Sequence, residues 1–185
     1  MGRNRGFDTE RALDAALRTF WERGYEASSI QDLCRAMEVQ PGSVYAAFGA
    51  KRDLFAAALR RYVRTVSTEA IDRISAAPTG GQGLRDYFTH LVDAMVDGDR
   101  RWGCLITNSL VEFAGRDPEL AGMMDLHLAN LRAAFAAALA RDGSARSGAS
   151  AGLLVAVVQG MNVLAKGRPG RAALESIAEA ALAGV

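Results

Sequence analysis

Apolar side chains recur at intervals of three and four residues along most of this 185-residue chain, a spacing that places them on one face of an α-helix. Leu13, Leu17 and Phe20 follow this spacing and predict a first helix that ends at Gly24. No stretch shows the alternation of apolar and polar residues that is typical of a half-buried strand. The pattern predicts an all-α fold of about nine helices.

Residues 28–48 are expected to form two short helices joined by a tight turn. Ser28 is a candidate N-cap for the first helix, and Gln31, three residues later, would complete a capping box. Pro41 suits the first position of the second helix, because its fixed φ matches a helix and its missing N–H is not needed there. No charged side chain occurs between Val39 and Phe48. The second helix therefore resembles one that enters the major groove of DNA.

The other predicted helices divide the chain into two domains. A Gly/Pro-rich loop at 78–83 is the clearest break. We expect a DNA-binding domain at 1–50, a linking helix at 51–76 and a second domain at 77–185. The buried face of the linking helix is expected to carry Leu54, Phe55, Leu59, Tyr62, Val63 and Val66. The helices of the second domain are expected at 84–98, 102–115, 118–141, 151–166 and 171–182.

Bulk composition excludes several classes of protein. The net charge is +1, with +3 in residues 1–64 and −2 in the rest, so the chain lacks a uniformly basic coat but has a modestly basic N-terminal part. Two distant cysteines argue against a disulfide framework and a four-ligand zinc site. The start of the chain has no signal-peptide pattern, and the apolar run 151–165 is too short for a membrane span. We expect a cytoplasmic protein with no membrane partner.

The sequence contains none of the residue patterns that are typical of an enzyme's active site. His90 and His127 are the two histidines, and neither belongs to a metal-ligand pair or to a nucleophile–base set. Gly80, Gly81 and Gly83 lack the Lys-Ser/Thr that follows a phosphate-binding loop, and we interpret them as a hinge or loop. We expect no catalytic residue, no metal and no cofactor.

An ordered set of residues in the first third of the chain resembles the TetR family of one-component transcriptional regulators. The matching residues are Phe20, Gly24-Tyr25, Ser29-Ile30, Gly42-Ser43-Val44-Tyr45, Phe48 and Lys51-Arg52-Asp53-Leu54. The resemblance implies a homodimer that binds a palindromic operator in double-stranded DNA, most often a repressor released by a small molecule. An activator or dual regulator, and a small-molecule carrier with a vestigial DNA-binding domain, stay open as alternatives.

The resemblance also implies a set of DNA-binding residues. Tyr45 and Lys51 match family positions that bind phosphates, whereas Gln40 stands where the family usually has a capping Ser or Thr. Arg3 and Arg5 precede the first helix as a basic arm, which would reach DNA or stay solvated. The predicted DNA-binding set is Ser29, Gln40, Pro41, Gly42, Ser43, Tyr45, Lys51, Arg3 and Arg5.

The second domain carries candidates for an effector pocket and a dimer interface. Polar residues on otherwise apolar helices suggest an effector pocket, with Trp102 and Met123 as its walls. The candidate pocket residues are Trp102, Cys104, Thr107, Asn108, Glu112, Met123, Gln159 and Asn162. More apolar surface than one core needs suggests a four-helix dimer interface formed by Leu153, Leu154, Val157, Val158, Met161, Leu164, Leu174, Ile177 and Ala181.

Cys104 has two interpretations. The segment Gly103-Cys104 resembles the start of the sixth helix in TetR members that respond to electrophiles, and a thiol in the first turn of a helix, near Arg100 and Arg101, would favour the thiolate. Cysteine is also a common buried residue that fills small gaps. Both a sensor and a structural role stay open for Cys104, and Cys34 is expected to be a packing residue.

Overall fold

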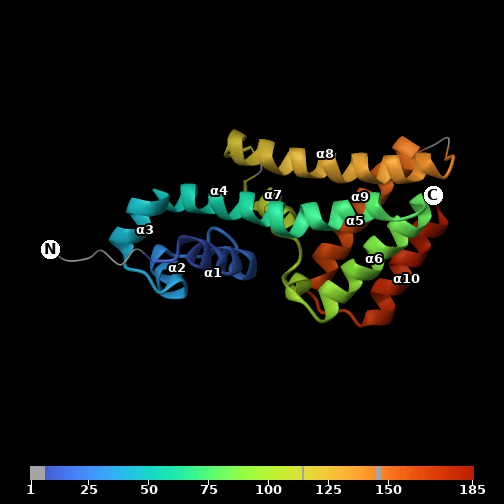
Figure 1. Ribbon diagram of the computed structural model, residues 1–185. Coiled ribbons are helices and arrows are strands. Elements are labelled where there is room, and N and C mark those ends of the chain that lie inside the picture. Colours follow the sequence, from blue (N-terminus) through green and yellow to red (C-terminus); the bar gives the residue numbers. More distant parts are fainter. Residues whose placement is uncertain (1–6, 114, 145–146) are drawn as a thin grey trace. The chain divides into compact units, whose positions relative to one another are not determined.

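The computed structural model describes residues 7–113, 115–144 and 147–185, and for residues 99 and 100 the backbone alone. The chain divides into two compact units, called unit 1 up to Val63 and unit 2 from Arg64. Every regular element in the described residues is helical, which confirms the predicted all-α fold (Figure 1). Counting the run from Lys51 to Ala76 as one helix yields nine α-helices in these residues, as predicted.

Unit 1 is built on aromatic side chains between its first and last helices. Its helices are α1 (Thr9–Arg23), α2 (Ile30–Met37), α3 (Pro41–Phe48) and α4 (Lys51–Tyr62). The rings of Phe20 and Phe55 meet edge to face with centroids 5.0 Å apart, and those of Trp21 and Tyr62 do so at 4.9 Å. This geometry is favoured because a positive ring edge meets a negative ring face. The α1–α4 pair is the support on which α2 and α3 pack.

An ion-pair cluster at the surface reinforces the α1–α4 pair. Arg61 on α4 donates to both carboxylate oxygens of Asp14, with Nη2 2.7 Å from Oδ2, and it also pairs with Glu10. The hydrogen bonds that Arg61 donates to Asp14 raise the pKa of Arg61 above its usual value. The cluster fixes the rotation of α4 about its own axis relative to α1.

The helix from Lys51 to Ala76 is interrupted by one π-helical turn. α4 continues into this turn, Val63–Ser67, and then into α5 (Thr68–Ala76). Four of the six residues predicted on the buried face of this helix are buried, whereas Val63 and Val66 are half-buried and Ser67, which was not predicted, is buried. A π turn holds one extra residue, so the inward face passes from Tyr62 directly to Ser67.

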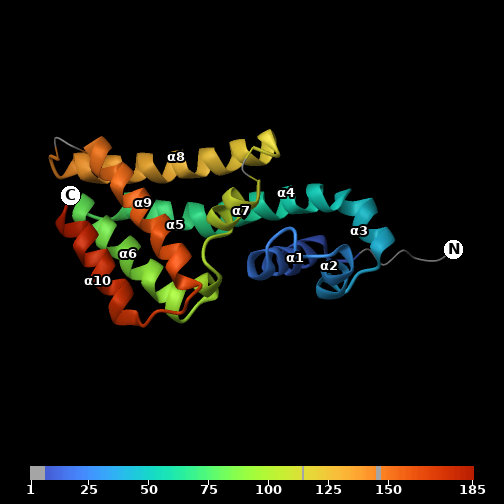
Figure 2. The same cartoon turned by 180° about the vertical axis from the view of Figure 1, so that it is seen from behind.

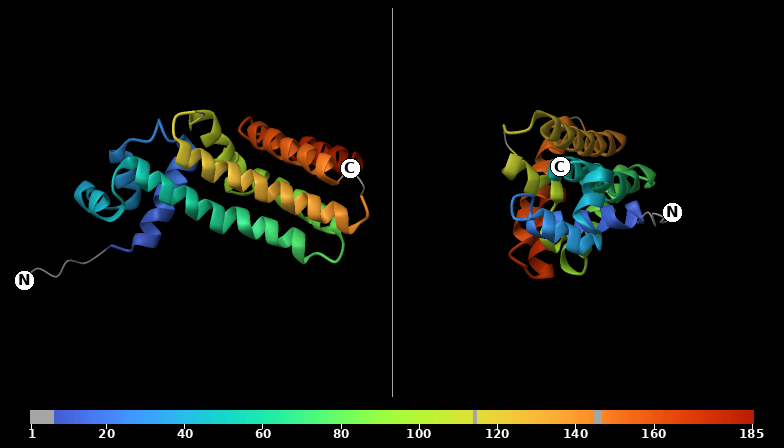
Figure 3. Two further views of the ribbon diagram at one scale, coloured as in Figure 1. Left: turned by 90° about the horizontal axis from the view of Figure 1, so that it is seen from above. Right: turned by 90° about the vertical axis from the view of Figure 1, so that its left-hand side faces the viewer.

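Unit 2 is a bundle of helices around a second aromatic cluster. Besides α5 it contains α6 (Gly80–Val96), a 3-10 turn (Asp99–Trp102), α7 (Leu105–Phe113), α8 (Pro118–Arg141), α9 (Ser147–Ala165) and α10 (Arg171–Ala183). The ring of Phe135 lies 5.1 Å from that of Tyr87 and 6.3 Å from that of Phe88. Helix α6 packs beside α10 (Figure 2), and α8 runs alongside α5 (Figure 3).

The glycines that the sequence analysis assigned to a loop belong to a helix. Gly80 to Gly83 form the first turn of α6, where a Cβ on Gly80 would lie 1.8 Å from the carbonyl oxygen of Ala138 and one on Gly83 would lie 2.5 Å from that of Ile74. The carboxylate of Asp142 accepts hydrogen bonds from the amides of Gly80, at 2.8 Å, and Gly81. These bonds hold the pKa of Asp142 below its usual value. The glycines allow three backbones to approach one another closely.

Other boundaries differ less from the prediction. Helix α8 begins at Pro118 after its N-cap Asp117 and ends at Arg141, as predicted, but α7 begins at Leu105 and not at Trp102. Helix α9 begins at Ser147, four residues before the predicted start, so by length and composition it could cross a membrane. This is weak evidence, because α9 contributes side chains to the core of unit 2 and core helices meet the same criteria.

We expect Gly80→Ala to destabilise the protein by about 3 kcal/mol or more, because the methyl group would overlap a backbone carbonyl that cannot move alone. The matched control is Gly122→Ala on α8, where a Cβ meets no atom within 4 Å and the higher helix propensity of alanine should add up to about 1 kcal/mol. Urea unfolding followed by circular dichroism measures the stability of both variants. Equal stabilities would contradict the close approach of Gly80 to the carbonyl of Ala138.

Candidate nucleic-acid interface

The predicted helix–turn–helix is present, with its turn in the expected place. Helix α2 ends at Met37, Glu38 adopts a left-handed conformation with φ 57°, and α3 begins at Pro41. Gln40 occupies the N-cap of α3, and its side chain makes no capping hydrogen bond. The sequence-based concern about this cap is confirmed: the first amides of α3 have no side-chain acceptor.

Helix α3 is almost uncovered. Val44 is the one buried residue of this fully described helix, and Tyr45 is 51% exposed. A Cβ on Gly42 would meet no atom within 4 Å, so the glycine is not required by packing within the protein. The exposed surface of α3 and its N-cap is uncharged and consists of small or hydroxyl-bearing side chains, together with Gln40. Such a surface can approach base edges closely without a charge to desolvate.

Lys51 is held in place by an aromatic ring. Its Nζ lies 4.3 Å from the centroid of the Tyr25 ring, within the range of a cation–π interaction. Tyr25 is in turn fixed by Phe55, whose ring centroid is 5.1 Å away. The lysine is the first residue of α4, so its ammonium lies at the positive end of the helix dipole, a place that suits an anion. Tyr25 was not among the predicted site residues, although the Gly24-Tyr25 pair in the family pattern pointed to it.

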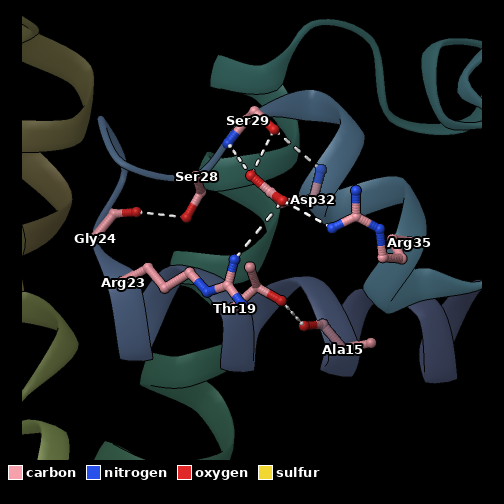
Figure 4. Close-up of polar contacts among 8 residues, drawn as sticks. All are labelled: Ala15, Thr19, Arg23, Gly24, Ser28, Ser29, Asp32 and Arg35. Atoms are coloured by element: carbon pink, nitrogen blue, oxygen red, sulfur yellow. Dashed lines mark hydrogen bonds and ion pairs between the residues drawn. The ribbon is translucent and has the colours of Figure 1, made fainter.

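The capping box of α2 differs from the prediction (Figure 4). Ser29 is the N-cap and Asp32 completes the box, whereas Ser28 is buried and donates its hydroxyl proton to the carbonyl of Gly24 at 2.6 Å. The Asp32 carboxylate accepts from the Ser29 hydroxyl at 2.6 Å and from the Ser29 amide at 3.2 Å. These bonds lower the pKa of Asp32. The hydroxyl of Ser29, a predicted DNA contact, is therefore already engaged within the protein.

Two arginines next to this box were not predicted. Asp32 lies 3.2 Å from Arg35 and 3.7 Å from Arg23, and both arginine side chains are more than half exposed. Two cations share one carboxylate, so the group keeps a net positive charge that suits phosphates. The spacing of Asp32 and Arg35 by three residues on α2 was the available sequence signal. The predicted contacts Arg3 and Arg5 lie outside the described residues.

Unit 2 contains a small cavity that brings together part of the predicted effector set. The cavity has a volume of about 10 Å³, room for about one water molecule. Cys104, Gln159 and Asn162 line it, as predicted, and Thr107 donates a hydrogen bond to Oε1 of Gln159 from beside it. We call it the Ser67 cavity; its full lining is Ser67, Ala70, Ile71, Tyr87, Cys104, His127, Leu131, Val158, Gln159 and Asn162.

The other predicted effector residues do not line the Ser67 cavity. Asn108 donates to the carbonyl of Trp102 at 3.0 Å and accepts from Lys166 at 3.0 Å, which ties α7 to the end of α9. Glu112 and Met123 are half-buried elsewhere on α7 and α8. The predicted effector set did not include Ser67, Tyr87 or His127, which also line the cavity.

The two cysteines are both buried. Cys104 is 3% exposed and precedes the first residue of α7, so the predicted position in the first turn is off by one residue. The side chain of Arg100, a predicted neighbour, lies outside the described residues. Burial raises the pKa of the Cys34 thiol, which keeps it protonated and unreactive. The burial of Cys104 favours its structural role over the sensor role.

The structure divides the predicted dimer interface into two groups. Leu153 and Leu164 are exposed on α9, and Val157 and Ile177 are half-buried. The remaining five side chains belong to the core of unit 2 and are not available to a second subunit: Leu154, Val158, Met161, Leu174 and Ala181. They were predicted at the interface because α9 is apolar on nearly all sides, whereas in the structure α9 packs on α6, α7, α8 and α10, and α10 also packs on α6.

Comparison with known proteins identifies the family. Residues 12–58 match the family described as bacterial regulatory proteins, tetR family. Residues 81–180 match the C-terminal domain of LmrA/YxaF-like transcriptional regulators. The two matches cover both helical units and include the α2–α3 segment. The chain belongs to the TetR family of transcriptional regulators.

Individual relatives agree with this assignment. The uncharacterized HTH-type transcriptional regulator YezE of Bacillus subtilis (strain 168) is 37% identical over 135 residues, which are 73% of this chain and 70% of YezE. The HTH-type transcriptional repressor BdcR of Escherichia coli (strain K12) is 27% identical over 99% of this chain and 90% of its own. A solved cysteine mutant of the TetR family regulator CifR, complexed with 26-bp operator DNA, is 29% identical, covers 98% of both chains and has a TM-score of 0.84.

We expect Ser29→Ala to lower the stability of the protein by about 1 kcal/mol, the usual contribution of a serine N-cap. Ser43→Ala is the matched control, since Ser43 is exposed in the first turn of α3 and no cap depends on it. Thermal unfolding of the two variants should differ by a few degrees. Equal melting temperatures would show that the capping box contributes nothing.

Proposed function

We propose that this TetR family protein is a homodimeric transcriptional repressor that binds a palindromic operator through α3 and is released by a small molecule bound in unit 2. The observation that carries the proposal is the uncovered, uncharged surface of α3, with open space at Gly42, followed directly by the ring-supported cation of Lys51. Small residues allow close approach to bases, and the lysine suits a neighbouring phosphate.

The relatives support the proposal. BdcR is named as a transcriptional repressor, and the CifR mutant was solved on operator DNA. In the proposed division of labour, residues 1–50 bind DNA, residues 51–76 link, and residues 77–185 bind the effector and form the dimer. A regulator of this kind acts in the cytoplasm, where the DNA is.

Tyr45 and Lys51 are expected to bind phosphates. Replacing Tyr45 by Ala should weaken binding to the DNA upstream of the protein's own gene about tenfold, because one hydrogen bond to a charged phosphate is lost. Lys51→Ala should also weaken binding and reduce the slope of log K against log salt by roughly one, because one fewer counterion is released. Fluorescence anisotropy at several salt concentrations measures both quantities.

The control for Lys51 is Lys166→Ala, which removes the chain's one other lysine from unit 2 and should leave the salt slope unchanged. If the Lys51 and Lys166 variants had the same slope as the wild type, Lys51 would not be a phosphate contact. If the wild type failed to bind its upstream DNA at all, the proposed function itself would be wrong.

The proposed dimer uses the exposed stripe of α9. This stripe consists of four residues that are at least partly exposed and are spaced four, three and four positions apart: Leu153, Val157, Gly160 and Leu164. A Cβ on Gly160 would meet no atom within 4 Å, so this position leaves room for a second helix to approach. A palindromic operator requires two reading helices related by a two-fold axis, and an apolar stripe of this kind is suited to an isologous contact.

Leu153→Asp should convert the dimer into a monomer, because it would bury an unpaired charge in the proposed interface. The matched control is Leu126→Asp on α8, where the leucine is 63% exposed and is not part of the proposed interface. Sedimentation velocity measures the oligomeric state, and circular dichroism checks that both variants are folded. If the Leu153→Asp variant were still a dimer, the interface would not be formed by this stripe of α9.

A further inference from the structure

The ammonium of Lys51 is held in place without a counter-charge. Its partner is the ring of Tyr25, and among the described residues it makes no ion pair. The carboxylate nearest to it in sequence belongs to Asp53, whose Oδ2 accepts a hydrogen bond from the amide of Ala50 at 3.0 Å. Arg61 and Arg171, by contrast, each bind two or more carboxylates. An aromatic ring attracts a cation but carries no net charge, so Lys51 keeps its full positive charge.

The position of the Tyr25 ring is determined by the core of unit 1. Gly24 ends α1 with a φ of 87°, a conformation that favours glycine, and Tyr25 follows it. The Tyr25 ring then stacks with that of Phe20 on α1, with centroids 6.1 Å apart, and meets that of Phe55 on α4 at 5.1 Å. Both phenylalanines are fully buried. The ring is therefore in place whether or not the lysine contacts it.

The geometry of α4 brings the lysine to this ring. Lys51 and Phe55 are four residues apart on one helix, so their side chains share a face, and both contact Tyr25. An ammonium has three N–H donors, and a ring below it leaves donors free on the opposite side. A lysine that binds an anion loses rotamer freedom. Because the ring already restricts Lys51, part of this entropy is lost before any anion arrives.

We infer that Tyr25 is a positioning residue for DNA binding: its ring aims the ammonium of Lys51 at a phosphate and leaves the positive charge uncancelled. A carboxylate in the same place would also hold the lysine, but it would cancel the charge that releases counterions from DNA. The inference rests on the proposed function, in which Lys51 contacts a phosphate. It adds a residue that acts on DNA binding through another residue.

The contact is tested first in the free protein. The chain contains two lysines, so isotope-labelled lysine produces side-chain NMR signals for Lys51 and Lys166 alone. Protons above an aromatic ring resonate upfield, and we expect this shift for the ε-protons of Lys51 in the wild type and in Tyr25→Phe. Tyr25→Leu should abolish it. Lys166, which donates to Asn108, is the internal reference. Identical Lys51 signals in all three proteins would overturn the inference.

A double-mutant cycle then separates positioning from support of the fold. Tyr25→Leu should weaken binding to the DNA upstream of the protein's own gene about threefold, the usual size of an exposed cation–π interaction. The salt slope should stay unchanged, because no charge is removed. In a Lys51→Met background, Tyr25→Leu should have no further effect on binding. Tyr25→Phe keeps the ring and should bind as the wild type does.

A fluorinated phenylalanine in place of Tyr25 provides a second test that keeps the shape of the ring. Fluorine withdraws electrons from the ring face, so this variant should be as stable as Tyr25→Phe but should bind DNA as weakly as Tyr25→Leu. Circular dichroism checks that each variant is folded at the assay temperature. This variant keeps the inference testable if Tyr25→Leu is unfolded.

Three results would overturn the inference while leaving the proposed function intact. Equal losses from Tyr25→Leu in both backgrounds would show that the tyrosine supports the fold alone. Weaker binding by Tyr25→Phe would show that the hydroxyl itself contacts DNA. Wild-type affinity in the fluorinated variant would show that the charge on the ring face has no role. If the wild type did not bind this DNA at all, the proposed function would be wrong as well.

Discussion

A helix shared by two compact units must present an apolar face to two cores. From Lys51 to Tyr62 this face packs on α1 through rings such as Phe55, and from Thr68 to Ala76 it packs on α6 and α8. Between the two faces, the helix contains one residue more than an uninterrupted α-helix would. The π turn supplies that residue. A half-buried Val66 and the unbonded hydroxyl of Ser67 are its consequences.

The interactions that stabilise unit 1 lie mainly outside α3, and α3 stays largely uncovered. Helix α3 buries Val44 alone, and its N-cap makes no side-chain hydrogen bond. Its stability comes from helices on either side, where the ring contacts of α1 with α4 and the Ser29–Asp32 box of α2 fix the frame. Because α3 contributes little to folding, its exposed residues are free to be selected for the surface they present.

The polar side chains inside unit 2 fall into two groups: some join neighbouring helices, and others face the Ser67 cavity. Asn108 and Lys166 tie helices together, and Asp142 with Arg141 anchors the ends of α5, α6 and α8. A few polar groups are turned instead toward the Ser67 cavity, among apolar neighbours that raise the strength of each hydrogen bond. Of the polar side chains at the cavity, Gln159 accepts from Thr107 on α7 and Asn162 donates to the carbonyl of Val158, whereas Ser67 Oγ makes no hydrogen bond.

The sequence by itself determined the all-α class, the helix–turn–helix with Pro41 at the start of α3, and the boundaries of α8, because periodicity, proline and capping residues act locally. Tertiary structure decided which faces turn inward. Five predicted interface residues became core because α9 and α10 pack on the other helices of unit 2, and the glycines after Pro78 became helical because backbones meet there. Ser67 replaced Val66 on the buried face because a π-helical turn precedes α5. These outcomes depend on contacts between distant segments, which local spacing does not contain.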